Sequence, residues 1–180
     1  MAEILVIEDN ETMRSGIVLV LQGMGHQVTA SAGGEDGLAQ MGNLTFDLVI
    51  SDYKMAPLDG LQVLEAIRQH HPETEVIIIT AHGSIEVAVE AMKGGAADFI
   101  TKPFPPEVLE MKTVSALSHK DLKTRNKRLD EENRYLREEV EGRFNFGEMV
   151  GDGPQMQDVF STVGKIAASD SAVLVYGESG

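Results

Sequence analysis

Four short apolar runs in the first part of the chain each lead into a polar residue that can carry chemistry. The runs cover residues 4–7, 48–50, 76–79 and 99–100. The polar residues that follow them, directly or within two positions, are Asp9, Asp52, Thr80 and Lys102. If the runs are neighbouring parallel strands, these groups converge at the sheet edge where ligands bind in open parallel sheets. Two carboxylates, a hydroxyl and an ammonium at one edge indicate a site that accepts a phosphoryl group.

The segments between these runs have helical patterns, which predicts an α/β domain. We expect strands at residues 4–7, 27–30, 47–51, 75–80 and 98–101, and helices at 11–24, 35–41, 60–70, 84–93 and from 106 onward. Gly25 lies in the position favoured after a helix C-terminus, and Pro72 follows the end of the third helix. Short apolar strands that alternate with helices predict a five-stranded parallel sheet covered by helices on both faces.

The acidic charge is concentrated in the first 110 residues, and this limits the possible partners. These residues carry 17 Asp and Glu against 5 Lys and Arg, so this part should repel a phosphate backbone and not bind nucleic acid. Residues 111–141 carry charges of alternating sign, which we interpret as a solvated helix. We expect no membrane helix, since no apolar run approaches roughly 20 residues. We also expect no secretory signal, and the absence of cysteine is compatible with a reducing cytoplasm.

The last helical pattern continues to Glu141 and contains a heptad repeat. Leu122, Leu129 and Leu136 recur every seven residues. With these leucines at the d positions, the a positions are His119, Asn126, Asn133 and Val140. Leucine at d with asparagine at a favours a parallel two-stranded coiled coil. A single amphipathic connector helix is the alternative interpretation of the same pattern.

Gly142 interrupts the helical pattern, and residues 143–180 are predicted to start a new segment. A helical pattern covers 156–168, and an apolar strand at 172–176 leads into Gly177-Glu178-Ser179-Gly180. A strand that feeds a glycine-rich turn is how a phosphate-binding loop begins. The lysine and hydroxyl residue that complete such a loop are not present, so we expect this chain neither to bind nor to hydrolyse ATP.

The carboxylates predicted to meet at the sheet edge favour a hard divalent cation. Asp9 and Asp52 would lie at adjacent strand ends with Glu8 beside them, an arrangement that is unfavourable unless a cation neutralises it or one acid takes up a proton. Mg²⁺ prefers oxygen ligands and is bound by one or two carboxylates together with phosphate oxygens. No His or Cys lies within metal-ligand spacing, which disfavours zinc and copper.

Beside such a cation, Asp52 can attack phosphorus as a carboxylate nucleophile and form an aspartyl phosphate. Phosphoryl transfer depends mostly on positioning and charge neutralisation. Lys102 would supply a compact cation for the phosphoryl oxygens, and Thr80 a hydroxyl donor that can turn toward them. Each residue alone also has an ordinary explanation as a helix cap, strand or loop residue. Their joint occurrence at strand ends favours the site.

The stretches that carry this site resemble the receiver domain of bacterial two-component response regulators over residues 3–118. They are Val6-Ile7-Glu8-Asp9, Asp52-Tyr53-Lys54-Met55, Leu58-Asp59-Gly60, Thr80-Ala81-His82 and Lys102-Pro103-Phe104. The resemblance implies a flavodoxin-like or CheY-like sheet with strand order 2-1-3-4-5. It also implies that a partner histidine kinase phosphorylates Asp52.

The same resemblance implies a role for each residue of the site. The implied Mg²⁺ site consists of Glu8, Asp9, Asp52 and the backbone carbonyl of Lys54. The residues implied to contact or respond to the phosphoryl group are Thr80, Lys102 and the switch aromatic Phe99. Two positions depart from the family pattern. Pro57 follows Met55-Ala56 and so lies one residue later than usual, and Phe99 stands where tyrosine is common.

The C-terminal segment is similar to the start of the AAA+ ATPase domain of sigma-54-dependent activators, the NtrC-like class. The stretches concerned are Met149-Val150-Gly151-Asp152, Met156-Gln157 and residues 173–180, where Gly-Glu-Ser-Gly opens the Walker A loop. The implied organisation is a receiver domain at 1–118, a last receiver helix that continues into a coiled-coil dimerisation linker at 107–141, and an AAA+ fragment at 143–180. The resemblance implies a homodimer, with sigma-54 RNA polymerase and DNA contacted only through other domains, and no membrane.

Two other functions use the same residues in different ways. A Mg²⁺-dependent phosphohydrolase of the haloacid-dehalogenase type also forms an aspartyl phosphate, but it requires a second acid two residues after the nucleophile, where this chain has Lys54. A flavodoxin-like nucleotide or flavin binder would present a first strand-to-helix turn that accepts phosphate. Here that turn is Glu8-Asp9-Asn10-Glu11, which is acidic and lacks glycine.

Overall fold

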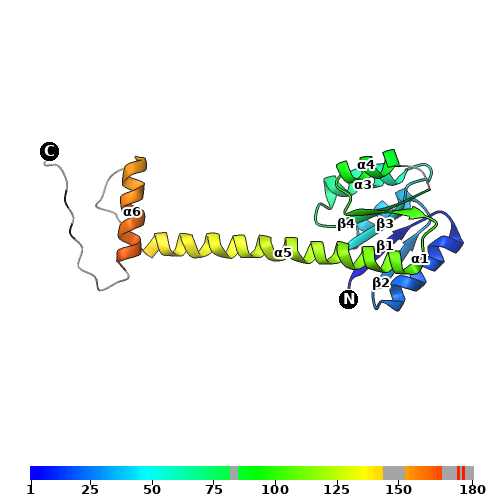
Figure 1. Ribbon diagram of the computed structural model, residues 1–180, viewed down its shortest axis with the longest axis horizontal. Helices are drawn as coiled ribbons and strands as arrows, with labels where there is room; N and C mark the ends of the chain where they lie inside the picture. The colour runs from blue at the N-terminus through cyan, green and yellow to red at the C-terminus, as the bar shows by residue number, and fades with distance from the viewer. Residues whose placement is uncertain (82–84, 144–152, 168–173, 175, 177–180) are drawn as a thin grey trace. The chain divides into compact units, whose positions relative to one another are not determined.

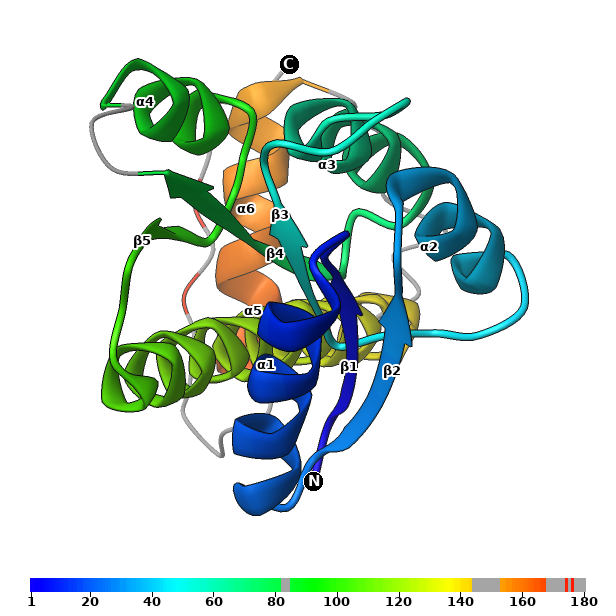
Figure 2. The ribbon, with the colours of Figure 1, turned by 90° about the vertical axis from the view of Figure 1, so that its right-hand side faces the viewer.

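The computed structural model describes residues 1–81, 85–143, 153–167, 174 and 176. Within them, one parallel sheet has the strand order β2-β1-β3-β4-β5 (Figures 1 and 2). Its strands are β1 (Glu3–Ile7), β2 (Gln27–Ser31), β3 (Leu48–Asp52), β4 (Glu75–Ala81) and β5 (Asp98–Lys102). The helices are α1 (Glu11–Gly23), α2 (Gly34–Met41), α3 (Gly60–His70), α4 (Ile85–Lys93), α5 (Pro106–Arg143) and α6 (Pro154–Ile166). The predicted α/β fold and its strand order are confirmed.

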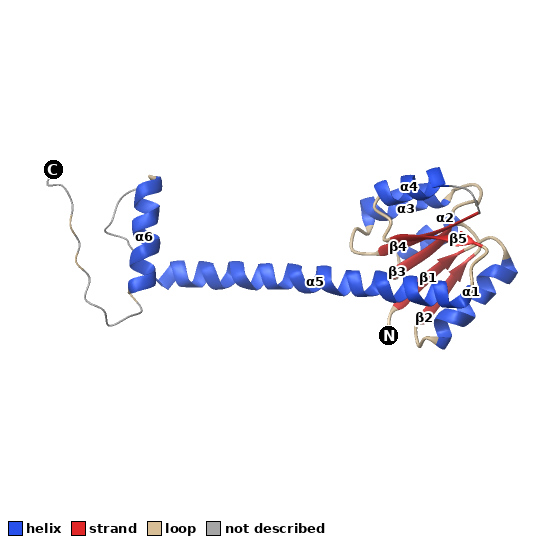
Figure 3. Cartoon of the chain, viewed as in Figure 1, coloured by secondary structure: helices blue, strands red, loops and turns tan. Residues whose placement is uncertain are grey.

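Helices cover both faces of the sheet, as Figures 2 and 3 show. Ile17 and Leu21 of α1 and Leu109 of α5 pack on one face, against alternate side chains of the strands. Side chains from α2, α3 and α4 pack on the other face and form a second core. Because both faces are buried, β1, β3 and β4 consist of nearly continuous apolar runs, and this is why the sequence revealed them.

Local sequence signals fix where the helices begin and end. Asn10 caps α1 by accepting a hydrogen bond from the Met13 N–H at 3.0 Å. Asp59 and Gln62 form a reciprocal capping box at the start of α3. Gly25 has φ +84°, a left-handed conformation that glycine adopts without strain after a helix. These caps place the helix starts beside the carboxyl ends of β1 and β3.

At the edge of the sheet where the strands begin, acidic residues at or next to the starts of β3 and β4 form ion pairs with basic residues of α3 and α5. We call this group the amino-edge cluster; its members are Asp47, Arg68, Glu75, His119, Lys120 and Lys123. Glu75 is 3% exposed, and its carboxylate lies 3.2 Å from His119 Nδ1, 3.4 Å from Lys123 Nζ and 3.7 Å from Arg68 Nη2. Asp47 accepts hydrogen bonds from Lys120 Nζ and from the Glu3 N–H. These contacts hold the first part of α5 against the sheet.

The charged helix expected over 111–141 is therefore solvated over only part of its length. Residues 121–135 are all exposed, including Leu122 and Leu129 of the predicted heptads. In contrast, Thr113 and Ala116 are buried against the sheet, so the interpretation was wrong for that face. His119, a predicted a position, contacts Glu75. The helix also continues through Gly142 to Arg143, since one glycine disfavours a helix by only about 1 kcal/mol.

The described residues form two compact units, residues 1–125 and 126–180. Within the second unit, α6 is a helix of 13 residues that begins with proline at its first position. Leu174 and Tyr176 of the strand expected at 172–176 are described, and neither lies in a strand. The turn Gly177-Glu178-Ser179-Gly180 and His82 lie outside the described residues. Within the part of the chain that is described, no helix combines the length and hydropathy of a membrane span.

Candidate functional site

Three carboxylates meet at the carboxyl edge of the sheet. Glu8 and Asp9 follow β1, and Asp52 ends β3, the neighbouring strand. One oxygen from each carboxylate lies within 4.8 Å of the others. Glu8 and Asp52 are buried, at 1% and 6% exposure, whereas Asp9 is exposed. The three charges are close enough for one cation to contact more than one carboxylate.

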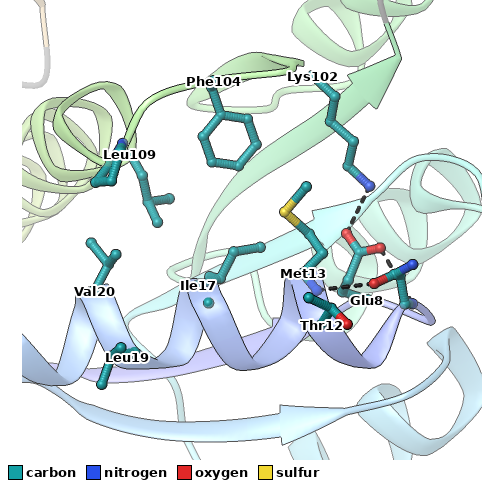
Figure 4. Close-up of a pocket in the computed structure, with 12 residues that line it drawn as sticks. Glu8, Thr12, Met13, Ile17, Leu19, Val20, Lys102, Phe104 and Leu109 are labelled. Carbon is teal, nitrogen blue, oxygen red and sulfur yellow. Dashed lines mark hydrogen bonds and ion pairs between the residues drawn. The ribbon is translucent and has the colours of Figure 1, made fainter.

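Lys102 reaches this cluster from the end of β5, on the far side of β4. Its Nζ lies 2.8 Å from Glu8 Oε2 and 3.0 Å from Asp52 Oδ1 (Figure 4 shows the bond to Glu8). Burial disfavours the charged ammonium, but the hydrogen bonds to Glu8 and Asp52 outweigh it, so the pKa of Lys102 is raised. The pKa of Glu8 is also raised, because burial outweighs its bond to Lys102. One ammonium therefore neutralises only part of the negative charge.

Thr80 and Phe99 lie on β4 and β5, the two strands that follow β3 in the sheet. Asp52 is opposite Ile79 of β4, and Thr80 is the next residue toward the carboxyl edge, 1% exposed. Phe99 of β5 is half-buried and lies opposite Ile78, so it shares a face of the sheet with Thr80. Lys112 Nζ of α5 lies 5.9 Å from the centroid of the Phe99 ring. Phe99 thus shares a face of the sheet with Thr80 and lies near Lys112 of α5.

The backbone next to Asp52 is closely packed against the start of α3. A Cβ atom at Gly60 would lie 2.5 Å from the Asp52 carbonyl oxygen and 2.9 Å from Tyr53 Cα. The Gly60 N–H also donates a hydrogen bond of 2.9 Å to the Tyr53 carbonyl. Only glycine allows this approach. The sequence predicts a helix that begins at Gly60, but not the backbone contacts that make a glycine necessary there.

The donor set fits a hard divalent cation, because the cluster offers carboxylate oxygens alone. Lys54, whose backbone carbonyl is a further predicted ligand, is exposed two residues after Asp52 in the connection to α3. A groove of about 740 Å³ runs from Glu8 and Lys102 along α1. Met13, Ile17 and Phe104 line it with apolar atoms (Figure 4). Of the three clustered carboxylates, Glu8 lines this groove.

Comparison with known proteins identifies relatives over most of the chain. The family profile of the response regulator receiver domain matches residues 4–113. The transcriptional regulatory protein ZraR of Salmonella typhimurium is 35% identical over 178 residues, 99% of this chain and 38% of its own length. The DNA-binding transcriptional regulator NtrC of the same organism is 35% identical over 175 residues, 97% of this chain and 35% of its own. This chain therefore spans little more than a third of these relatives.

Solved structures also superpose on most of this chain. NtrX from Brucella abortus superposes with a TM-score of 0.73 at 30% identity, over 94% of this chain and 36% of that protein. A response regulator receiver domain protein from Clostridium thermocellum superposes with a TM-score of 0.65 at 34% identity, over 68% of this chain and 98% of that protein.

Proposed function

This chain belongs to the response regulator receiver family, and we propose that Asp52 is its phosphoacceptor. The observation that supports this most strongly is the position of Lys102, whose ammonium lies 3.0 Å from Asp52 at the edge of a three-carboxylate cluster. Receiver domains are regulatory phosphoacceptors that bind Mg²⁺ at an acidic pocket, and Glu8, Asp9 and Asp52 form an acidic cluster here. We assign Mg²⁺ to these carboxylates and to the backbone carbonyl of Lys54.

In the proposed reaction, a carboxylate oxygen of Asp52 forms a bond to phosphorus. The bond between phosphorus and the donor breaks at the same time, and its electron pair leaves with the donor, a phosphohistidine of a kinase or a small acyl phosphate. Mg²⁺, when bound, supplies positive charge to the phosphoryl oxygens. Lys102 supplies a second positive charge, and Glu8 holds the Lys102 ammonium beside Asp52. The protein therefore contributes to this reaction by positioning the reacting groups and by neutralising their charge.

The proposed consequence of phosphorylation is a rearrangement that starts at Thr80. The hydroxyl of Thr80 turns toward the new phosphoryl group, and the ring of Phe99, on the same face of the sheet, follows it. The surface of α4, β5 and α5 then repacks. Both arrangements exist before phosphorylation, which shifts the ratio between them.

We propose that this change controls an attached ATPase through the state of a homodimer. Residues 1–118 are the proposed receiver domain, 107–141 the dimerisation linker, and 143–180 the start of an AAA+ domain. The exposed Leu122 and Leu129 of α5 support a coiled coil in the linker. In this scheme a histidine kinase supplies the phosphoryl group in the cytoplasm, and sigma-54 RNA polymerase and DNA are contacted through domains outside this chain.

The test is incubation of the chain with acetyl phosphate and Mg²⁺, followed by intact-mass measurement. We expect the mass of one added phosphoryl group for the wild type and for Asp47→Asn, which removes a carboxylate from the opposite edge. We expect none for Asp52→Asn. Phosphorylation of Asp52→Asn, or an unchanged mass of the wild type, would contradict the proposed function.

A further inference from the structure

The connection from β1 to α1 carries two of the three clustered carboxylates, so its backbone decides where they lie. The Glu8 N–H donates to the Ser31 carbonyl at 3.1 Å, which continues the pairing with β2. Asn10 caps α1 at the other end of the connection. Between these two anchors, the carbonyls of Glu8 and Asp9 need other partners.

Arg14 supplies those partners from the first turns of α1. Its Nη1 donates to the Glu8 carbonyl at 2.7 Å and to the Asp9 carbonyl at 3.3 Å. The side chain is half-buried, so water screens these bonds only in part. A single nitrogen thus donates to two consecutive carbonyls of the acidic pair, and the charge of the guanidinium strengthens both bonds.

The two acids differ in how their carboxylates are held. The Glu8 carboxylate is fixed by Lys102 at 2.8 Å and by the Asn10 N–H at 3.4 Å. The Asp9 carboxylate is exposed, and no residue in the described ranges donates a hydrogen bond to it. The Asp9 backbone, which Arg14 holds, therefore sets the region that the Asp9 oxygens can reach.

We propose that Arg14 is a positioning residue for the cation site: its guanidinium fixes the backbone of Glu8 and Asp9 so that the Asp9 carboxylate is held within reach of a cation shared with Asp52. This inference rests on the proposed function. Partners that orient metal ligands typically change metal affinity by about 10- to 100-fold when removed. Arg14 touches neither the cation nor the phosphoryl group, so its loss should weaken cation binding more than the transfer itself.

The experiment titrates MgCl₂ into the full 180-residue chain and follows the backbone amide signals of residues 8–10 and 52–54 by NMR. For Arg14→Gln we expect the Mg²⁺ dissociation constant to rise about tenfold. Phosphorylation by acetyl phosphate at saturating Mg²⁺ should stay within about twofold of the wild type. Arg14→Lys keeps the charge and a nitrogen that can donate to both carbonyls, but on a side chain of different length and shape, so we expect a smaller rise of roughly threefold. Lys93→Gln, an equal change of charge at an exposed position of α4, is the matched control.

The outcomes separate this inference from the function on which it rests. If the wild type binds Mg²⁺ and accepts phosphate while Arg14→Gln has an unchanged dissociation constant, the inference is wrong even if the variant is less stable. A rise in Arg14→Lys as large as that in Arg14→Gln also overturns it, since a side chain that can still donate to both carbonyls would then have no effect on the cation site. If Arg14→Gln does not fold, the value for Arg14→Lys decides. A wild type that neither binds Mg²⁺ nor accepts phosphate contradicts the proposed function instead.

Discussion

The two edges of the sheet each hold a cluster of acids and bases, but the balance of charge differs. At the carboxyl edge, three carboxylates lie near one ammonium, that of Lys102. At the amino edge, the carboxylates of Asp47 and Glu75 meet three permanent cations and His119. A cluster that its own side chains neutralise can serve as an anchor for α5. A cluster with excess negative charge leaves room for an external cation, which is what the proposed chemistry requires.

The pKa values agree with this contrast. Burial raises the pKa of Glu8 at the carboxyl edge even though Lys102 opposes it. At the amino edge, burial also disfavours the charged form of Asp47, but hydrogen bonds from Lys120 and the Glu3 N–H outweigh it and lower its pKa. The cost of burying a carboxylate therefore determines the direction of the pKa shift at the carboxyl edge, whereas hydrogen bonds outweigh this cost at the amino edge.

The largest effect is expected on the rate of phosphorylation, and it should distinguish two lysines that each bind a carboxylate, Lys102 at the carboxyl edge and Lys120 at the amino edge. Lys102→Ala should slow phosphorylation by acetyl phosphate on the order of 100-fold, because it removes a charge from the reacting group. Lys120→Ala should leave that rate within about twofold and lower the free energy of unfolding by about 1 kcal/mol. Rates from intact-mass time courses and urea unfolding measure both effects. Equal losses of rate in the two variants would remove the functional difference between the edges.

Neutralising one buried glutamate at each edge should change stability in opposite directions. Glu75→Gln should lower the free energy of unfolding by about 2 kcal/mol, because it leaves the partly buried Arg68 guanidinium without its carboxylate. Glu8→Gln should raise it without divalent cations, since burial disfavours the charged form of Glu8 and raises its pKa. Urea unfolding at neutral pH with EDTA is the measurement. Destabilisation by Glu8→Gln would show that the charges at the carboxyl edge already neutralise one another without a divalent cation.

Acid should affect the two edges with opposite sign. The pKa of Glu8 is higher in the folded than in the unfolded state, so on acidification the folded state takes up a proton first. The free energy of unfolding therefore rises as the pH falls from the pKa of the folded state toward that of the unfolded state, about 4.3. Asp47 has a lowered pKa, so its contribution is present above the unfolded value of about 3.9 and is lost as pH falls through the folded pKa. The Asp47 effect should stay below about 1 kcal/mol, because its side chain is 37% exposed.

Unfolding curves across this pH range test both signs with two variants. Glu8→Gln should remove the rise, and Asp47→Asn should remove the loss at the lowest pH. An identical pH dependence of stability in the wild type and both variants would contradict the assignment of these carboxyls.

The smallest expected effect concerns His119, the most exposed member of the amino-edge cluster. His119→Gln should change the free energy of unfolding by less than about 0.5 kcal/mol, because its side chain is 62% exposed and Glu75 keeps Lys123 and Arg68. Urea unfolding at low and high salt measures it. A loss as large as that of Glu75→Gln would show that the histidine, and not the permanent cations, neutralises the buried acid.

The sequence determined the sheet and the groups at its carboxyl edge. Apolar runs in β1, β3, β4 and β5 identified the strands, and parallel connections bring every strand's carboxyl end to the same edge. Asp9, Asp52 and Lys102 could therefore be expected together from the order of the residues alone. Each belongs to a different strand end, yet its position along its own strand was sufficient to place it.

Only the tertiary structure decided which charges meet at the amino edge and which backbone atoms Arg14 holds. Asp47 and Lys120 are 73 positions apart, and Glu75 and His119 are 44 apart. Nothing in the alternating charges of α5 distinguishes the lysines that face the sheet from those in solvent. Periodicity specifies an element and its buried side, because both follow from local backbone geometry. Contacts between distant side chains depend on how a helix lies across the sheet, which packing of the whole domain sets.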